Sequence, residues 1–184
     1  MFTLIFSLIT FFWLLELIIH RPDRSKEGVV ERRSLLLIWC SLIVSITISA
    51  ISSHYQLTSI QHKSTWLPFL GLIIYASGVM LRWWGIHELG NNFSRHIKVS
   101  DHTQLVSSGP YRLLAHPLYF GILLSLSGIA LCLNTWLGLV SVWLLMLPVL
   151  MVRIRLEERA MLAQFGDSYA LWLKKRRRLI PFLY

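Results

Sequence analysis

Charged residues are scarce in this sequence: they make up 15% of its 184 residues, and only nine of them are acidic. A soluble domain usually carries about 25% charged residues, so this scarcity excludes an ordinary soluble fold. Cysteine is also rare. The two that are present, Cys40 and Cys132, stand inside apolar stretches without metal-ligand spacing, and we interpret them as small apolar core residues.

Short motifs of several common protein classes are missing as well. The sequence contains no G-x-G-x-x-G, no P-loop, no H-E-x-x-H and no CxxC pair, which argues against usual nucleotide binding and against a metal hydrolase. The formal net charge of +9 comes from residues between and after apolar segments, where they would face anionic lipid headgroups. No nucleic-acid recognition motif accompanies that charge. We therefore expect neither a nucleic acid nor a metal ion as a partner.

Apolar residues dominate what is present. They make up 55% of the chain, and its mean hydropathy is +0.58, as in integral membrane proteins. Stretches long and apolar enough to cross a lipid bilayer as helices cover residues 1–19, 34–52, 66–86, 117–133 and 135–152. The last two form a helical hairpin around Asn134. The sequence therefore predicts an all-α fold, an integral membrane bundle of five transmembrane helices in one domain, residues 1–184.

The basic residues indicate how this bundle is oriented. With five spans, Lys63 lies alone on one side and every other Lys and Arg lies on the opposite side. The positive-inside rule makes the basic side cytoplasmic, with the C-terminus inside and the N-terminus outside. Glu16, within the first span, is costly in lipid and is expected to face the bundle or to reach the interface.

The C-terminal part changes pattern after Val152, where apolar residues recur at near-helical spacing beside charged ones. This spacing predicts amphipathic helices. Gly166 is expected to end the first of them and Asp167 to cap the next. The basic run 174–178 is expected to lie against lipid headgroups.

The polar stretch from His87 to Ala115 is too long for a simple connection, which takes about 2–8 residues in helical bundles. Within it Gly109-Pro110 signals a turn. Pro117 stands where a helix begins, because the first helical position needs no backbone donor. His116 is thus predicted beside the free N–H groups of a helix N-terminus, which favour an anionic ligand group. A plain helix cap at the lipid interface is the alternative.

Arg153 and Glu157 stand four positions apart at the end of the last predicted span, so they share one helix face. An interfacial salt bridge would explain the pair without any further role. A guanidinium group in this position could also orient a carboxylate by a charge-assisted hydrogen bond. The spacing leaves both interpretations open.

The residues of the polar stretch resemble a known family. Gly109-Pro110-Tyr111, His116-Pro117-Leu118-Tyr119 and Gly121 resemble the G-x-Y…H-P-x-Y-x-G signature of the isoprenylcysteine carboxyl methyltransferase (ICMT) family. Further matching motifs lie at residues 89–94, 153–158, 165–169 and 178–181, so the resemblance covers roughly residues 87–181. Two positions depart from many members, which have Arg in place of Ala115 and Trp in place of Phe93.

The resemblance implies an integral membrane methyltransferase that uses S-adenosyl-L-methionine without a Rossmann domain. Residues 1–86 would supply three N-terminal spans and residues 87–184 the methyltransferase region, with a cofactor-binding segment on the cytoplasmic face. Arg153 would hold the substrate, and Arg153 and Glu157 would be the catalytic pair. The implied cofactor site consists of His96, Thr103, Gln104, Leu105, Val106, Tyr111, His116, Pro117, Leu118, Tyr119 and Glu157.

The chemistry of these residues agrees with that implication. The rings of Tyr111 and Tyr119 could stabilise a sulfonium cation by about 0.5–2 kcal/mol each. A carboxylate acceptor already carries its lone pair at neutral pH, so orientation and desolvation would supply most of the rate. The resemblance to short prokaryotic members places the protein in a prokaryotic cytoplasmic membrane, with a lipophilic small molecule or a prenylcysteine-type compound as its substrate.

Three other functions remain open at this point. Related membrane enzymes that share the H-P-x-Y hairpin methylate phospholipid amines or small thiols. An NADPH-dependent sterol-type reductase has a similar membrane topology, although no basic cluster for a phosphate stands within residues 87–119. A membrane scaffold without enzymatic activity is the last alternative.

Overall fold

The computed structural model describes residues 1–19, 29–60, 66–90 and 105–180, and in 29–31 only the backbone. The helices of these residues are α1 (Phe2–Ile19), α2 (Val29–His54), α3 (Trp66–Leu89), η3 (Gly109–Arg112), α4 (Pro117–Cys132), α5 (Trp136–Ser141), η4 (Val142–Met146), α6 (Leu147–Phe165) and α7 (Asp167–Lys174). Within the described ranges the only β-type pairings are isolated bridges. The predicted all-α fold is confirmed for this part of the chain.

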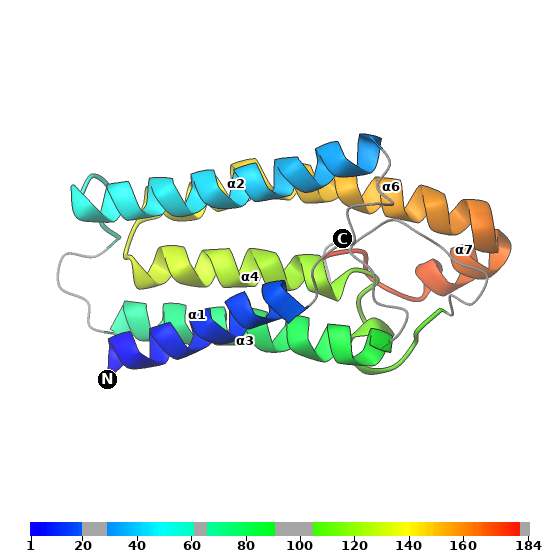
Figure 1. Ribbon diagram of the computed structural model, residues 1–184, viewed down its shortest axis with the longest axis horizontal. Helices are drawn as coiled ribbons and strands as arrows, with labels where there is room; N and C mark the ends of the chain where they lie inside the picture. Colours follow the sequence, from blue (N-terminus) through cyan, green and yellow to red (C-terminus); the bar gives the residue numbers. More distant parts are fainter. Residues whose placement is uncertain (20–28, 61–65, 91–104, 181–184) are drawn as a thin grey trace.

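The long helices run side by side along the longest axis of the molecule (Figure 1). α2 packs against α5, η4 and α6 on one side, and α1 packs against α3 on the other. α4 lies between these two layers (Figure 1). The short helix α7 and residues 175–180 lie at one end of the bundle, where α4 begins (Figure 1).

Among the described residues, four helices are long and apolar enough to cross a membrane: Phe2–Ile19, Arg32–His54, Trp66–Leu89 and the continuous helix Trp136–Phe165. α4 is apolar but has 16 residues, and at about 1.5 Å per residue it falls short of a hydrocarbon core of about 30 Å. The protein is thus a multi-pass integral membrane protein, and the described part of its chain contains four candidate spans.

The end of the last predicted span requires a correction. The sequence pattern predicts this end at Val152, with amphipathic helices after it, but α5, η4 and α6 form one helix of 30 residues that reaches Phe165. No glycine or proline interrupts the chain between Val152 and Phe165, so the helix continues. It ends at Gly166, which adopts a φ of 50°. Asp167 is the first residue of α7 and Gly166 holds the N-cap position without a side-chain hydrogen bond, so the expected cap by Asp167 was wrong. The predicted stop at Gly166 is confirmed.

Glycines bring α3 and α4 into backbone contact. A Cβ atom on Gly128 would lie 2.4 Å from the backbone nitrogen of Tyr75, and one on Gly71 would lie 2.5 Å from that of Cys132. A Cβ on Gly78 would likewise lie 2.6 Å from the backbone nitrogen of Ser125. Close approach of this kind is typical of helices packed within membranes, where small residues let backbones touch.

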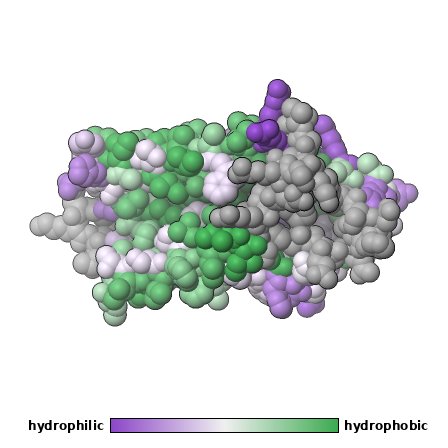
Figure 2. Space-filling view, viewed as in Figure 1, coloured by the Kyte–Doolittle hydropathy of each residue, from purple (hydrophilic) through white to green (hydrophobic). Residues whose placement is uncertain are grey.

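The face of the bundle seen in Figure 2 is largely apolar between its two ends. Large hydrophobic side chains such as Leu8, Ile43 and Leu144 are more than half exposed, as expected of surfaces that face lipid. Cys40 belongs to this exposed surface, so its interpretation as a core residue was wrong. Cys132 is half-buried and its thiol donates to the Pro68 carbonyl at 3.5 Å.

Candidate active site

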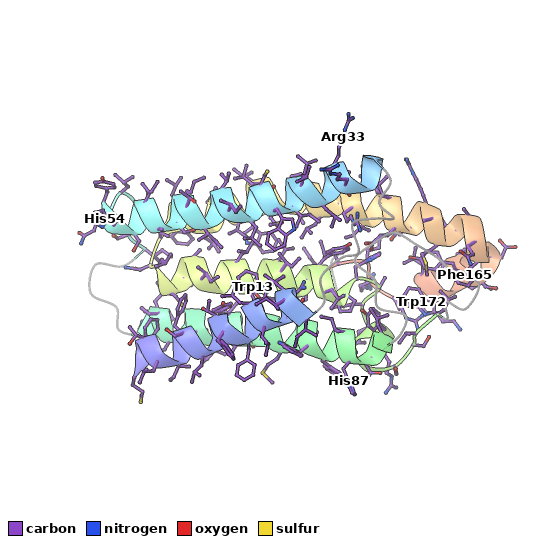
Figure 3. The ribbon with its side chains drawn as sticks, in the orientation of Figure 1. Trp13, Arg33, His54, His87, Phe165 and Trp172 are labelled. Atoms are coloured by element: carbon purple, nitrogen blue, oxygen red, sulfur yellow. The ribbon has the colours of Figure 1, made fainter. Side chains whose placement is uncertain are left out.

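A group of ionisable side chains lies where α4 begins, at the end of the bundle that carries α7. It consists of His116, Tyr119, Arg153, Glu157 and Glu158, and we call it the His116 cluster. Its members come from two elements, the entry of α4 and the middle of α6. In Figure 3, Trp172 and Phe165 mark this end and His54 marks the opposite one.

His116 is buried at the N-cap position of α4, directly before Pro117. Its Nδ1 lies 3.5 Å from Glu157 Oε2, and its Nε2 lies 3.5 Å from Glu158 Oε1. Burial by itself lowers the pKa of His116, but the two neighbouring carboxylates raise it, and the net shift is upward. Nε2 is buried and makes no hydrogen bond within the described part of the chain.

Arg153 and Glu157 pair along α6 as their spacing predicts, with 3.2 Å between Arg153 Nε and Glu157 Oε1. The same Nε lies 3.3 Å from the hydroxyl of Tyr119, which donates its proton to Glu157. Arg153 is 1% exposed. A salt bridge therefore exists here, but it is buried within a network and is not an isolated surface pair.

Ser34 of α2 also belongs to the surroundings of Arg153, because its hydroxyl accepts a hydrogen bond from Arg153 Nη1 at 2.8 Å. Ser34 is itself buried. Ser34 is not among the predicted site residues, since nothing in the pattern of an apolar helix marks one serine among several. Glu158 is not among them either, and the adjacent Glu157 in a charged motif was the available signal for it.

The segment after α7 folds back over the entry of α4. The backbone N–H groups of Ala115 and His116 donate to the carbonyls of Arg177 and Arg178 at 2.7 and 3.0 Å. Arg178 also donates to Glu158 at 2.9 Å, so this chain end contacts the His116 cluster directly. Arg176 donates to the Tyr111 carbonyl and lies over the Trp172 ring, 4.1 Å from its centroid.

This arrangement corrects the expectation that the whole run 174–178 faces headgroups. Lys174, Lys175 and Arg177 are exposed, whereas Arg176 and Arg178 turn inward and are partly buried. The physical reason is the backbone pairing with residues 113–116, which points alternate side chains in opposite directions.

Other residues of the expected cofactor site lie around the His116 cluster. Tyr111 is buried in η3, and a Cβ on Gly85 of α3 would meet both Leu118 and the Tyr111 hydroxyl, at 2.8 and 3.6 Å. Burial raises the pKa of Tyr111 above its ordinary value, with Glu157 adding to the shift. The phenol therefore stays neutral.

The remaining expected residues are more dispersed. Pro117 is fully buried at the first position of α4. Leu105 and Val106 are partly buried, and the Val106 carbonyl accepts from Trp172 Nε1 of α7 at 3.1 Å. His96, Thr103 and Gln104 lie outside the described residues. The structure thus brings His116, Tyr119, Arg153 and Glu157 into contact, with Tyr111 and Leu118 adjacent.

Comparisons with known proteins agree with the motifs. The profile of the isoprenylcysteine carboxyl methyltransferase (ICMT) family matches residues 69–163. The chain is 31% identical over 145 residues to the protein-S-isoprenylcysteine O-methyltransferase of Xenopus laevis, covering 74% of this chain and 50% of that protein. It is 30% identical over 101 residues to the uncharacterized protein YpbQ of Bacillus subtilis, covering 55% of this chain and 59% of that protein.

A solved structure shares the fold. The structure of the eukaryotic intramembrane Ras methyltransferase ICMT superposes with a TM-score of 0.72 at 22% identity, over 99% of this chain and 65% of that one. The chain spans half of the length of the Xenopus laevis relative. Since the family profile matches more than half of its residues, the chain belongs to the ICMT family, whose members use S-adenosyl-L-methionine.

Proposed function

We propose that this protein is an integral membrane methyltransferase that transfers a methyl group from S-adenosyl-L-methionine to a lipophilic carboxylate of the prenylcysteine type. The observation that carries the proposal is the His116 cluster, in which the family signature residues His116 and Tyr119 contact Arg153 and Glu157. Membership of the ICMT family supports the same activity.

The residues of this end fit the cofactor chemically. S-adenosyl-L-methionine supplies a methyl group on a sulfonium cation and carries a charged amino-acid portion. Tyr119 and Tyr111 offer neutral aromatic rings, whose faces attract a cation. His116 Nε2 is buried and faces Glu158 Oε1 at 3.5 Å without a hydrogen bond among the described residues, and such an atom is stabilised by a ligand that pairs with it. Glu157 offers a carboxylate to donors of the cofactor.

Arg153 would act on the acceptor. Its guanidinium is held by Glu157, Tyr119 and Ser34, so its direction is fixed before any substrate binds. A fixed guanidinium can orient a carboxylate with two parallel hydrogen bonds. Because it is buried, water competes little with such a bond. An ionised carboxylate needs no proton acceptor, so the network has only to bind, orient and exclude water.

We further propose that α4, although shorter than an average hydrocarbon core, crosses the membrane as a fifth span, because a bilayer can thin locally around a short helix. This span would bring the cluster to the cytoplasmic face of a prokaryotic membrane. The excess of Lys and Arg around that face supports this orientation. Reporter fusions at Thr58 and at the C-terminus test it, since they should report opposite sides of the membrane. Cytoplasmic signals from both fusions would contradict the topology.

Direct binding to detergent-purified protein tests the activity class. S-adenosylhomocysteine should bind and NADPH should not, and His116→Ala should weaken the binding while the protein stays folded. His54→Ala is the matched control, because His54 is exposed at the opposite end of the bundle (Figure 3). Binding of NADPH instead would favour a reductase.

The acceptor class needs a second measurement, which is methyl transfer to a model prenylcysteine compared with a phospholipid amine and a small thiol. We expect transfer to the carboxylate. Transfer to the amine or the thiol alone would retain the methyltransferase and overturn the substrate class.

A further inference from the structure

A buried ion pair joins α1 to α3 inside the bundle. Glu16 is fully buried, and Arg82 is 6% exposed. Arg82 Nε donates to Glu16 Oε2 at 2.7 Å and Arg82 Nη2 donates to Glu16 Oε1 at 2.5 Å, so the guanidinium meets both oxygens of the carboxylate. Ionised groups within a membrane helix are costly unless they are paired, and they commonly have a functional role.

Arg82 makes a third contact, and it is directed at the candidate active site. Its Nη1 donates to the backbone carbonyl of Leu118 at 3.1 Å. Leu118 lies in the first turn of α4, between the two signature residues His116 and Tyr119. One guanidinium therefore links α1, α3 and the entry of α4.

The aliphatic part of the Arg82 side chain also explains why Gly121, the last residue of the family signature, is a glycine. A Cβ atom on Gly121 would lie 2.6 Å from Arg82 Cγ and 2.9 Å from the Gly78 carbonyl oxygen. The side chain of Arg82 thus crosses α4 at Gly121, one turn beyond its contact with Leu118. Only a residue without a side chain leaves room for it there.

We infer that Glu16 and Arg82 form a positioning pair that sets the first turn of α4 and so places His116 and Tyr119. Stability alone is a weak reason for such a pair, because the desolvation of two buried charges offsets most of their attraction. The guanidinium group of Arg82 is held by Glu16 and bonded to the Leu118 carbonyl, so it limits where the first turn of α4 can lie. The inference rests on the proposed function and adds α1, which lies outside the residues matched by the family profile.

The chain offers a matched control on the same two helices. Tyr75 of α3 donates from its hydroxyl to Thr10 of α1 at 3.2 Å, and Tyr75 is fully buried. Removing this hydroxyl loosens α1 against α3 without touching Leu118. Tyr75→Phe therefore reports what a purely structural α1–α3 contact does.

The experiment compares Arg82→Lys, Glu16→Gln and Tyr75→Phe in the full-length protein. Arg82→Lys keeps the charge opposite Glu16 but lacks the fork that reaches both the carboxylate and Leu118. Four quantities are measured: the melting temperature, the S-adenosylhomocysteine affinity, kcat/KM per folded molecule, and amide hydrogen exchange in residues 118–122. Glu16→Gln keeps the size of the side chain, so the test does not depend on one variant folding.

We expect Arg82→Lys and Glu16→Gln to speed amide exchange in residues 118–122 and to lower kcat/KM about tenfold or more, since small displacements of catalytic groups are costly. Tyr75→Phe should lower the melting temperature alone. Equal exchange and equal kcat/KM in all three variants would overturn the positioning role. If wild type fails to bind S-adenosylhomocysteine, the proposed function is wrong, and the exchange measurement still decides whether the pair positions α4.

Discussion

Arg153 Nη1 donates to the hydroxyl of Ser34 at 2.8 Å, although the two residues stand 119 positions apart in the sequence. Both side chains are buried. The contact brings the first turns of α2 to the candidate substrate-binding residue. The surroundings of Arg153 are therefore built from the N-terminal half of the chain as well as from α6.

Ser34→Ala should impair the use of the acceptor more than the binding of the cofactor. Without the hydroxyl, the buried guanidinium loses a hydrogen bond of the charged type, typically about 1.5–3 kcal/mol. We expect kcat/KM for a model prenylcysteine to fall by about tenfold or more, with S-adenosylhomocysteine affinity unchanged. Ser34→Thr, which keeps the hydroxyl, should restore activity. Equal losses for acceptor and cofactor would show that Ser34 only stabilises the fold.

Arg153→Lys and Glu157→Gln should distinguish a residue that acts on the substrate from one that binds the cofactor. Lysine keeps the positive charge of Arg153 but cannot bind two carboxylate oxygens with a planar fork, so turnover should fall more than cofactor affinity does. Glu157→Gln removes a negative charge within 3.5 Å of His116, so S-adenosylhomocysteine binding should weaken directly.

Methyl transfer, S-adenosylhomocysteine affinity and melting temperature are measured on the same preparations of both variants and of wild type. A purely structural salt bridge predicts modest losses of stability with activity per folded molecule intact. Full specific activity in both variants would remove Arg153 and Glu157 from the catalytic assignment.

The protein without ligand should be more stable at mildly acidic pH than at alkaline pH, because of His116. Its folded-state pKa is raised above the ordinary value of 6.5 by Glu157 and Glu158. The stabilisation is therefore fully present below about pH 6.5 and is lost as the pH rises through the folded-state pKa. Arg153, Arg178 and Tyr119 also face this network.

Thermal unfolding of wild type and His116→Gln tests this pH dependence. A range of about pH 5.5–9 covers the titration of a histidine. In wild type the melting temperature should fall as the pH rises, by about 2–4 °C for each kcal/mol of unfolding free energy that is lost. The slope should flatten in the variant. An equal slope in both proteins would assign the pH dependence to another group.

Gly128→Ala should destabilise the bundle strongly, because its new methyl group would lie 2.4 Å from the backbone nitrogen of Tyr75 and 2.7 Å from the Gly71 carbonyl. Backbone atoms of a packed helix cannot move aside cheaply, and overpacking costs about 1–3 kcal/mol or more. Gly90→Ala is the control, since its Cβ meets no described residue within 4 Å, although its φ is 48°. Thermal unfolding of the two variants gives the comparison. A smaller loss for Gly128→Ala than for Gly90→Ala would contradict close α3–α4 packing.

Local pattern alone was enough for several features of this protein. Long apolar runs dictate membrane helices because backbone groups in lipid must bond within their own segment. Pro117 fixed the start of α4, and Gly166 fixed the end of α6 through its positive φ. The spacing of Arg153 and Glu157 placed them on one helix face, and the ordered signature around His116 indicated the family.

Tertiary structure decided which distant residues meet. Ser34 faces Arg153, Glu16 faces Arg82, and Arg178 faces Glu158 only because separate segments pack together, and helical periodicity carries no information about a partner on another segment. Backbone pairing with residues 113–116 likewise turned Arg178 inward, although its sequence context is that of a headgroup-facing basic run. The sequence by itself determined the helices and the reactive residue types. The packing of α1, α2 and the chain end around α4 determined how those residues are held.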